Sequence, residues 1–499
     1  MAATMSVKGT ILALPAELLL QVSSYLTTTE LCSLRRSCKD VEGTLRHSFT
    51  REFFTKRQFM LEEISLQALV DISLHPVYSK SLQEVIISLH SVQSSILPHI
   101  YDQLLHHHGH LAQDVLLSTG QARDMLVAAL SRLPNLRSLN LRDYNARGRL
   151  RDGERASWKS YGWSYDGALQ GVAAQNGLDH GARAEVLYAT AFGLVLHALG
   201  LANSTPERFE VFFRHRCDDG VGLPLHGLRI LDGPLAGTVK NVLRGLKVLM
   251  LTLAGPDSSF TELLNVQSSE VDRVAHPLKR LLEHAPNLER LRLNFSPDQV
   301  FAQRYLEWFA NPKSTSMAWS NLTCLDIGMV CLKESLLTSV VSKFNLTELN
   351  LWKITLISKY ENETDSPWID FLQTLTAPSR PRTNTRTMKK MTIGYPTTET
   401  PRRASTPVPV FFYEEDGTSH PTRLAAYNAS TDGADFSQWT DALAKKVKED
   451  LIARRLAPTV NPMSDVDEED SDDESDDEDA SLDSDIEDES VSDEDDSDF

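Results

Sequence analysis

Short segments with leucine at every second or third position recur between residues 82 and 351 of this 499-residue chain. They alternate with stretches that carry apolar residues at helical spacing, such as 270–284, 298–310 and 332–343. One helix–strand unit of this size cannot bury its apolar face alone, so neighbouring units must stack. The pattern therefore predicts an α/β solenoid. The strand-like segments are 82–89, 136–141, 246–251, 288–293, 322–327 and 346–351.

Most of these segments read Leu-x-x-Leu-x-[Leu/Ile], which resembles the core of a leucine-rich repeat. The spacing is irregular, with steps of 42, 34 and 24 residues from Leu246 onward, because helices of different length intervene. Leu133-Pro-Asn135 and Ala285-Pro-Asn287 precede two of the segments, where proline ends a helix and asparagine turns the chain. The rival fold is a doubly wound α/β domain, which is disfavoured because no glycine-rich phosphate turn follows these segments.

Residues 11–58 have the pattern of three short helices that follow an N-terminus (1–10) expected to be disordered. Pro15 suits the first turn of a helix, and one apolar stripe then follows, formed by Leu18, Val22, Tyr25 and Leu26. The threonines at 27–29 and Glu30 fit the start of a second helix. Three helices of this length barely cover one another, so some apolar side chains should face a partner or the next domain.

The same residues resemble the F-box, the helical module that ties substrate adaptors to the Skp-type linker subunit of cullin–RING (SCF) ubiquitin ligases. Leu14-Pro15-x-Glu17-Leu18 and Leu34-Arg35-x-x-Cys38-Lys39 carry the resemblance, and residues 52–59 are similar to a fungal group of F-box proteins. An unrelated three-helix cap is the alternative. The resemblance implies that the linker contacts some of the following positions while others fill the module's own core: Leu14, Pro15, Leu18, Val22, Leu26, Leu31 and Leu34.

An insertion at residues 146–185 interrupts the solenoid expected over 59–395. It contains seven glycines and a run of arginines and aromatics, expected to be exposed, that includes Arg151. Because Trp, Tyr and Arg dominate binding hot spots, the insertion is a candidate substrate-recognition loop. Base stacking on nucleic acid and a flexible insertion with its aromatics tucked under the solenoid are the alternatives. The candidate substrate-binding residues are Arg155, Trp158, Tyr161, Trp163 and Tyr165.

The net charge of −19 belongs to a C-terminal tail. Residues 464–499 hold 22 acidic and no basic residues, so the other residues carry a charge of about +3, which argues against nucleic-acid binding. Residues 458–499 are expected to be disordered. The tail fits solubility, a basic partner such as a histone, or an internal clamp on the 146–185 insertion. Candidate phosphosites, each followed three residues later by an acid, are Ser464, Ser471, Ser475, Ser484, Ser490 and Ser492.

Before the tail, residues 396–434 are expected to be rich in loops, with an added edge strand at 408–413. Residues 435–457 then have the spacing of one amphipathic helix that packs on the body of the protein. The apolar stretch from Leu187 to Ala202 is too short for a membrane span and predicts a buried helix.

We expect no catalytic residue, metal or cofactor. The chain lacks G-x-S-x-G, HExxH and Walker A motifs, and the histidines at 106–108 and 110 have no ligand partners at zinc spacing. Five scattered cysteines and an N-terminus without a signal peptide indicate an intracellular protein of the cytoplasm, the nucleus or both.

The resemblance implies a non-catalytic substrate adaptor. Its F-box would bind a Skp-type linker and, through it, the cullin and RING subunits, while the solenoid would bind a protein substrate. The alternative is an acidic-tailed nuclear scaffold or histone-binding protein without a ligase role.

Overall fold

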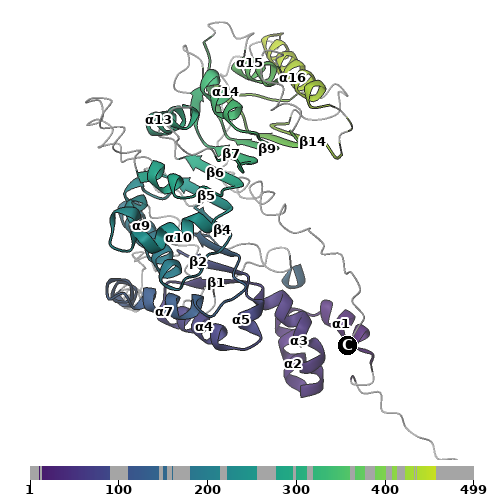
Figure 1. Ribbon diagram of the computed structural model, residues 1–499. Coiled ribbons are helices and arrows are strands. Elements are labelled where there is room, and N and C mark those ends of the chain that lie inside the picture. The colour runs from purple at the N-terminus through teal and green to yellow at the C-terminus, as the bar shows by residue number, and fades with distance from the viewer. Residues whose placement is uncertain are drawn as a thin grey trace, which may run out of the picture. The chain divides into compact units, whose positions relative to one another are not determined.

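The computed structural model describes residues 11, 14–89, 111–144, 150–153, 160, 180–213, 222–254, 277–295, 299–311, 319–359, 366–376, 388–399, 407–412, 422–431, 433 and 435–456 (Figure 1). The chain divides into a unit of residues 1–452 and a second unit of residues 453–499. Every element below belongs to the first unit, apart from the end of the last helix.

One large sheet runs through this unit, and its strands lie side by side in chain order. Every neighbouring pair is parallel except the last, where β14 is antiparallel to β11. The strands are β1 (Lys56–Met60), β2 (Glu84–Ser88), β3 (Ser138–Arg142), β4 (Arg208–Phe212), β5 (Val248–Leu253), β6 (Arg290–Phe295), β7 (Cys324–Gly328), β9 (Glu348–Trp352), β11 (Lys390–Gly394) and β14 (Leu424–Asn428).

This strand order confirms the solenoid and excludes the doubly wound alternative, in which the order reverses at a switch point. The six predicted strand-like segments correspond to β2, β3, β5, β6, β7 and β9. Sequence reasoning missed β1, β4, β11 and β14, which lack the Leu-x-x-Leu-x-Leu spacing. Because β1 begins at Lys56, the last residues assigned to the F-box belong to the first strand of the sheet.

The leucines of the repeat form two rows across the core side of the sheet. Alternate side chains of a strand point to opposite faces, so an in-register stack places equivalent residues next to each other. Nearly all of these side chains are fully buried. One row is Val85, Leu139, Phe209, Leu249, Leu291, Leu325, Leu349 and Met391. The other is Ile87, Leu141, Val211, Leu251, Leu293, Ile327, Leu351 and Ile393.

A layer of helices covers the leucine-bearing face (Figure 1). The helices of this layer are α4 (Glu63–Leu74), α5 (Tyr78–Ser81), α7 (Gln121–Leu130), α9 (His180–Leu201), η4 (Leu225–Asp232), α10 (Ala236–Gly245), α13 (Gln299–Ala310), α14 (Glu334–Lys343) and α15 (Pro367–Thr376). Neighbouring helices contact each other within two runs, from α4 to α10 and from α13 to α15. The predicted buried helix at 187–202 corresponds to the C-terminal part of α9, which ends at Leu201, and α13 and α14 match the predictions for 298–310 and 332–343. Residues 277–283 of the predicted helix 270–284 are helical, residue 284 forms a turn, and residues 270–276 lie outside the described residues. Within the described ranges, no helix combines the length and apolarity that a membrane crossing needs.

The repeated asparagine before a strand links consecutive repeats. The side-chain amide of Asn135 donates a hydrogen bond to the carbonyl oxygen of Lys80 (2.6 Å). Asn287 donates in the same way to the carbonyl oxygen of Arg244 (2.8 Å). Each asparagine therefore satisfies a backbone acceptor just before the preceding strand of the sheet, a more specific role than the turn predicted from sequence.

A second, smaller sheet follows the C-terminal strands of the first. It contains β8 (Cys331–Lys333), β10 (Thr355–Ile357), β12 (Thr397–Glu399) and β13 (Val408–Pro409), in the order β13-β12-β10-β8. Each parallel strand of the small sheet follows a strand of the large sheet in the chain, and a residue with left-handed backbone geometry lies between the two. These residues are Met329, Lys353 and Tyr395, with φ between 51° and 55°. Met329 and Lys353 donate their N–H groups to the carbonyl oxygen of the last residue of the neighbouring large-sheet strand, β9 or β11. Tyr395 donates its N–H to the carbonyl oxygen of the residue that precedes β14. One turn geometry thus repeats along the array.

The region expected to be loop-rich, 396–434, contributes β12, β13 and β14. β13 pairs antiparallel at the edge of the small sheet, so the edge strand predicted at 408–413 is present at Val408–Pro409. Helix α16 (Phe436–Leu456) confirms the amphipathic helix expected at 435–457. Its Phe436 and Trp439 pack on Tyr427 of β14.

Candidate interaction surface of the N-terminal helices

The N-terminal residues form α1 (Ala16–Ser24), α2 (Thr28–Ser37) and α3 (Lys39–Phe54). Pro15 is the N-cap of α1, one position earlier than the predicted first turn. Thr27 and Glu30 form a capping box: the Thr27 N–H donates to Glu30 Oε2 (2.9 Å), and the Glu30 N–H donates to Thr27 Oγ1 (3.4 Å). The Thr27 N–H and the Thr27 hydroxyl both donate to the Glu30 carboxylate, and these two bonds hold the pKa of Glu30 below its ordinary value. The predicted start of the second helix is therefore correct.

The three helices bury a small core. Leu19, Leu31, Val41 and Leu45 are each at most 3% exposed. Arg35 of α2 packs over the ring of Phe49 on α3, with its guanidinium carbon 3.4 Å from the ring centre. The module continues directly into the solenoid, because the ring of Phe54 stacks on Tyr78 of α5 at 3.9 Å.

The structure separates the seven predicted linker-binding residues into two groups. Leu14, Pro15, Leu18 and Val22 are exposed, and Leu18 and Val22 lie one turn apart on α1. Leu26 and Leu34 are half-buried against the hydrophobic core, and Leu31 is fully part of it. Linker binding by these residues stays a prediction, but the exposed group is the one available to a partner.

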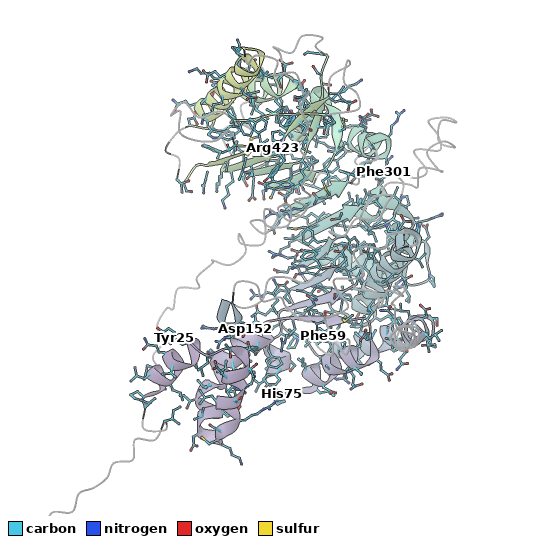
Figure 2. All side chains as sticks on the ribbon, turned by 180° about the vertical axis from the view of Figure 1, so that it is seen from behind. Tyr25, Phe59, His75, Asp152, Phe301 and Arg423 are labelled. Carbon is cyan, nitrogen blue, oxygen red and sulfur yellow. The ribbon has the colours of Figure 1, made fainter. Side chains whose placement is uncertain are left out.

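Two further apolar residues of this segment, Ile11 and Tyr25, are exposed, whereas the exposed Leu20 lies about 200° from Leu18 around α1. Tyr25 is 80% exposed and lies at the edge of the N-terminal helices (Figure 2). The helical spacing had placed it on the apolar stripe of α1, but sequence reasoning did not include it among the contact residues. The name "α1 face" is used below for Ile11, Leu14, Leu18, Val22 and Tyr25. Such a concentration of exposed apolar side chains on one short helix and the residues that flank it marks an interaction site.

The described turn of the insertion at residues 150–153 contacts the N-terminal helices. The 3₁₀ turn η2 (Leu150–Asp152) places Arg151 against α1 and α3 and Asp152 against α2 (Figure 2). The expectation that Arg151 belongs to an exposed run is therefore wrong, since its side chain is only 11% exposed. Ser160 is also buried and accepts a hydrogen bond from the Gln58 side chain of β1 (2.9 Å).

The other candidate residues of the insertion and the tail lie outside the described residues. These are Arg155, Trp158, Tyr161, Trp163 and Tyr165, and the serines at 464, 471, 475, 484, 490 and 492. The histidines at 106–108 and 110 also fall outside the described ranges.

Charged side chains occupy the sheet face opposite the helices. The buried carboxylate of Asp326 on β7 accepts hydrogen bonds from Arg290 Nε (2.9 Å), Arg292 Nε (3.2 Å) and Asn350 Nδ2 (2.5 Å). Burial alone would favour the neutral acid, but the two guanidinium groups and the Asn350 amide hold the pKa of Asp326 below its ordinary value. Asp326 is therefore an ionised link between three neighbouring strands.

The pKa of Glu210 on β4 shifts in the opposite direction to that of Asp326. Its carboxylate is 3.8 Å from Arg142 and 3.6 Å from Arg208, both beyond hydrogen-bond distance. Burial dominates, and it raises the pKa of Glu210 above its ordinary value despite the two arginines.

One group on this face has the donor types of a metal site. Ligand atoms of Cys324, Asp326 and Glu348 lie within 4.8 Å of one another. Two positive charges already compensate this group, because Arg290 pairs with both Asp326 and Glu348 and Arg292 pairs with Asp326. Burial also raises the pKa of the Cys324 thiol, which disfavours the thiolate that metals bind. The group is therefore an ion-paired part of the sheet.

Comparison with known proteins agrees with the N-terminal geometry. The F-box domain model matches residues 11–41, which cover α1, α2 and the start of α3. No curated protein sequence matches the chain. Among solved structures, the chain is similar to the leucine-rich repeat-containing protein LegL7 from Legionella pneumophila, with 12% identity and a TM-score of 0.26 over 78% of this chain and 98% of that one.

The fold and the matched domain together define the class. The chain carries an F-box domain followed by an α/β array of leucine-rich, repeat-like units. The assignment of the array rests on the strand order, the register and the two rows of core side chains described above.

Proposed function

We propose that this protein is the substrate adaptor of an SCF-type cullin–RING ubiquitin ligase. Its F-box would bind a Skp-type linker subunit, and the linker would connect it to the cullin and RING subunits. The observation that carries the proposal is the α1 face, a set of exposed apolar side chains inside the matched F-box domain. Exposed apolar area of this kind gains free energy when a partner covers it, at about 25 cal/mol per Å².

The adaptor itself would perform no chemistry. A bound substrate would be held near the ubiquitin-loaded enzyme of the complex, which raises the effective concentration of its lysines. The strand face opposite the helices supports a protein-binding role for the array, because Arg290 and Glu348 remain partly exposed there. The proposed location is the cytoplasm, the nucleus or both.

Co-purification of the linker subunit tests the proposal. A double variant, Leu14→Ala with Pro15→Ala, removes two exposed residues of the F-box without opening its core. We expect linker recovery to fall by at least ten-fold, because central contacts of an interface typically contribute more than about 2 kcal/mol. Ile64→Ala is the matched control, since Ile64 is an exposed apolar residue on α4 outside the F-box. Equal recovery of the linker with the double variant and the control would exclude the proposal.

The acidic tail supports a second candidate, a nuclear scaffold that binds histones or other basic proteins without a ligase. Deletion of residues 464–499 distinguishes the two. An adaptor keeps its linker subunit after the deletion, whereas a scaffold of this kind loses its basic partners.

A further inference from the structure

Arg151 joins two of the N-terminal helices from a position far along the chain. Its guanidinium group donates to both carboxylate oxygens of Glu52 on α3, at 2.5 and 2.6 Å. The same group donates to the carbonyl oxygens of Ser23 (3.0 Å) and Leu26 (2.7 Å) at the C-terminal end of α1. A cation at this position is favourable because the last carbonyl groups of a helix lack partners within the helix and carry partial negative charge.

Asp152 makes the complementary contact with the third helix. Its carboxylate accepts hydrogen bonds from the N–H of Thr28 (2.7 Å) and from the Thr28 hydroxyl (2.5 Å), and Thr28 is the first residue of α2. The N–H groups of the first helical turn lack partners within the helix, so a carboxylate stabilises this end. The capping box of Thr27 and Glu30 satisfies other donors of the same turn. Asp152 therefore supplements that cap.

Two adjacent residues of the insertion thus bind all three N-terminal helices. Arg151 holds the end of α1 to α3, and Asp152 holds the start of α2. The α1–α2 junction lies between these contacts and carries Tyr25 of the α1 face. The fold of residues 11–54 alone lacks these contacts. α1 itself buries few side chains, chiefly Leu19 and Ser23. Because so little packing holds this helix, the hydrogen bonds from Arg151 are important for its orientation.

We propose that Arg151 and Asp152 are positioning residues of the F-box, which fix the α1 face in the orientation that the linker subunit binds. The effect on linker binding rests on the proposed function. The claim that Arg151 and Asp152 hold the three helices in place does not. Through η2, the insertion then stabilises the F-box helices, in addition to any role in substrate recognition.

Deuterium exchange of the full-length chain tests the structural part without any partner. In the double variant Arg151→Ala with Asp152→Ala, the backbone amides of residues 16–37 should exchange about ten-fold faster or more, because several charge-assisted hydrogen bonds are lost. Amides of β5, β6 and β7 should keep their protection, which shows that the array remains folded. Arg304→Ala is the matched control: Arg304 forms an exposed ion pair with Glu307 on α13, away from these helices.

Affinity for a purified Skp-type linker tests the positioning role. The double variant should bind about ten-fold more weakly or worse, and Arg304→Ala should bind like the parent chain. Arg151→Lys should fall between, because lysine keeps the charge but loses the paired donors that match a carboxylate.

Unchanged exchange in residues 16–37 would overturn the proposal. So would faster exchange with unchanged linker affinity, since the contacts would then stabilise the fold without orienting the α1 face. If the parent chain binds no linker, the proposed function fails, and the exchange experiment still decides whether Arg151 and Asp152 hold the three helices.

Discussion

Leu18 and Leu19 are neighbours on α1 but lie in opposite environments: Leu19 is 3% exposed, and Leu18 is 46% exposed. The helix turns by about 100° per residue, so one side chain enters the core of the N-terminal helices while the next faces away from it. This pair separates the two roles that the F-box sequence combines, which are folding of the module and display of a partner surface.

The pair predicts a clean division of mutational effects. Leu19→Ala should lower the free energy of unfolding by about 2–5 kcal/mol, because it leaves a cavity in the core. Leu18→Ala should change it by no more than about 0.5 kcal/mol. Denaturant unfolding followed by circular dichroism measures both. Equal destabilisation by the two variants would show that Leu18 also belongs to the core.

The capping box of α2 predicts a smaller effect. Thr27→Ala removes the hydroxyl that accepts the Glu30 N–H and should cost about 1 kcal/mol of stability. Thr44→Ala is the control, since Thr44 lies exposed within α3 and its hydroxyl bonds only back to the Asp40 carbonyl among the described contacts. That variant should be neutral or slightly stabilising. A loss at Thr44 equal to that at Thr27 would contradict the cap assignment.

The asparagine that links repeats can be tested at Asn287. Asn287→Ala should destabilise the chain by about 1 kcal/mol, because the Arg244 carbonyl loses its side-chain donor. Asn321 precedes Leu322 as Asn287 precedes Leu288, and its amide oxygen accepts a 3.5 Å hydrogen bond from Ser320. Asn321→Ala therefore serves as the control and should have the smaller effect in the same unfolding assay.

Asp326 predicts a pH dependence. Its pKa in the folded protein lies below the ordinary value of 3.8, so its ionised form stabilises the fold above pH 3.8. This stability is lost as the pH falls through the lowered pKa of the folded state. Asp326→Asn should cost about 3 kcal/mol at pH 7, because it leaves Arg290 and Arg292 without their shared carboxylate.

The pH dependence distinguishes this ion pair from simple packing. Below pH 3.8 the stability of the parent chain should approach that of Asp326→Asn, measured by thermal unfolding at a series of pH values. A constant difference between the two proteins from pH 7 to pH 2.5 would mean that the charge of Asp326 contributes nothing.

Much of the array was predictable from the sequence because its signal is local. Leu249 and Leu251 of β5 have the leucine spacing of a repeat, and the stacked register follows from that spacing. The prediction missed β4, because its core residues, Phe209 and Val211, alternate in the same way but are not leucines. The residues at β14 were expected to form a loop, and their pairing with β11 depends on tertiary contact.

The docking surface was predictable only in part. The sequence identified apolar residues of the F-box, but it could not separate Leu18 from Leu31, because burial depends on how the three helices pack. Arg151 carried no signal of its role: its partner Glu52 is 99 residues away, and the surrounding arginines and aromatics pointed to substrate recognition instead. Contacts between distant segments of this kind have no spacing that a sequence pattern can detect.

Binding of the linker subunit to the α1 face is the central claim, and it is tested most directly by a charge placed on that face. Leu18→Asp combined with Val22→Asp in the full-length chain should leave the unfolding midpoint nearly unchanged, because both residues are exposed. Calorimetric titration with a purified Skp-type linker should then show binding reduced by at least about 100-fold, since two carboxylates would be buried without partners. Ile64→Asp should bind the linker as the parent chain does. Undiminished affinity of the Leu18 and Val22 double variant would contradict the account.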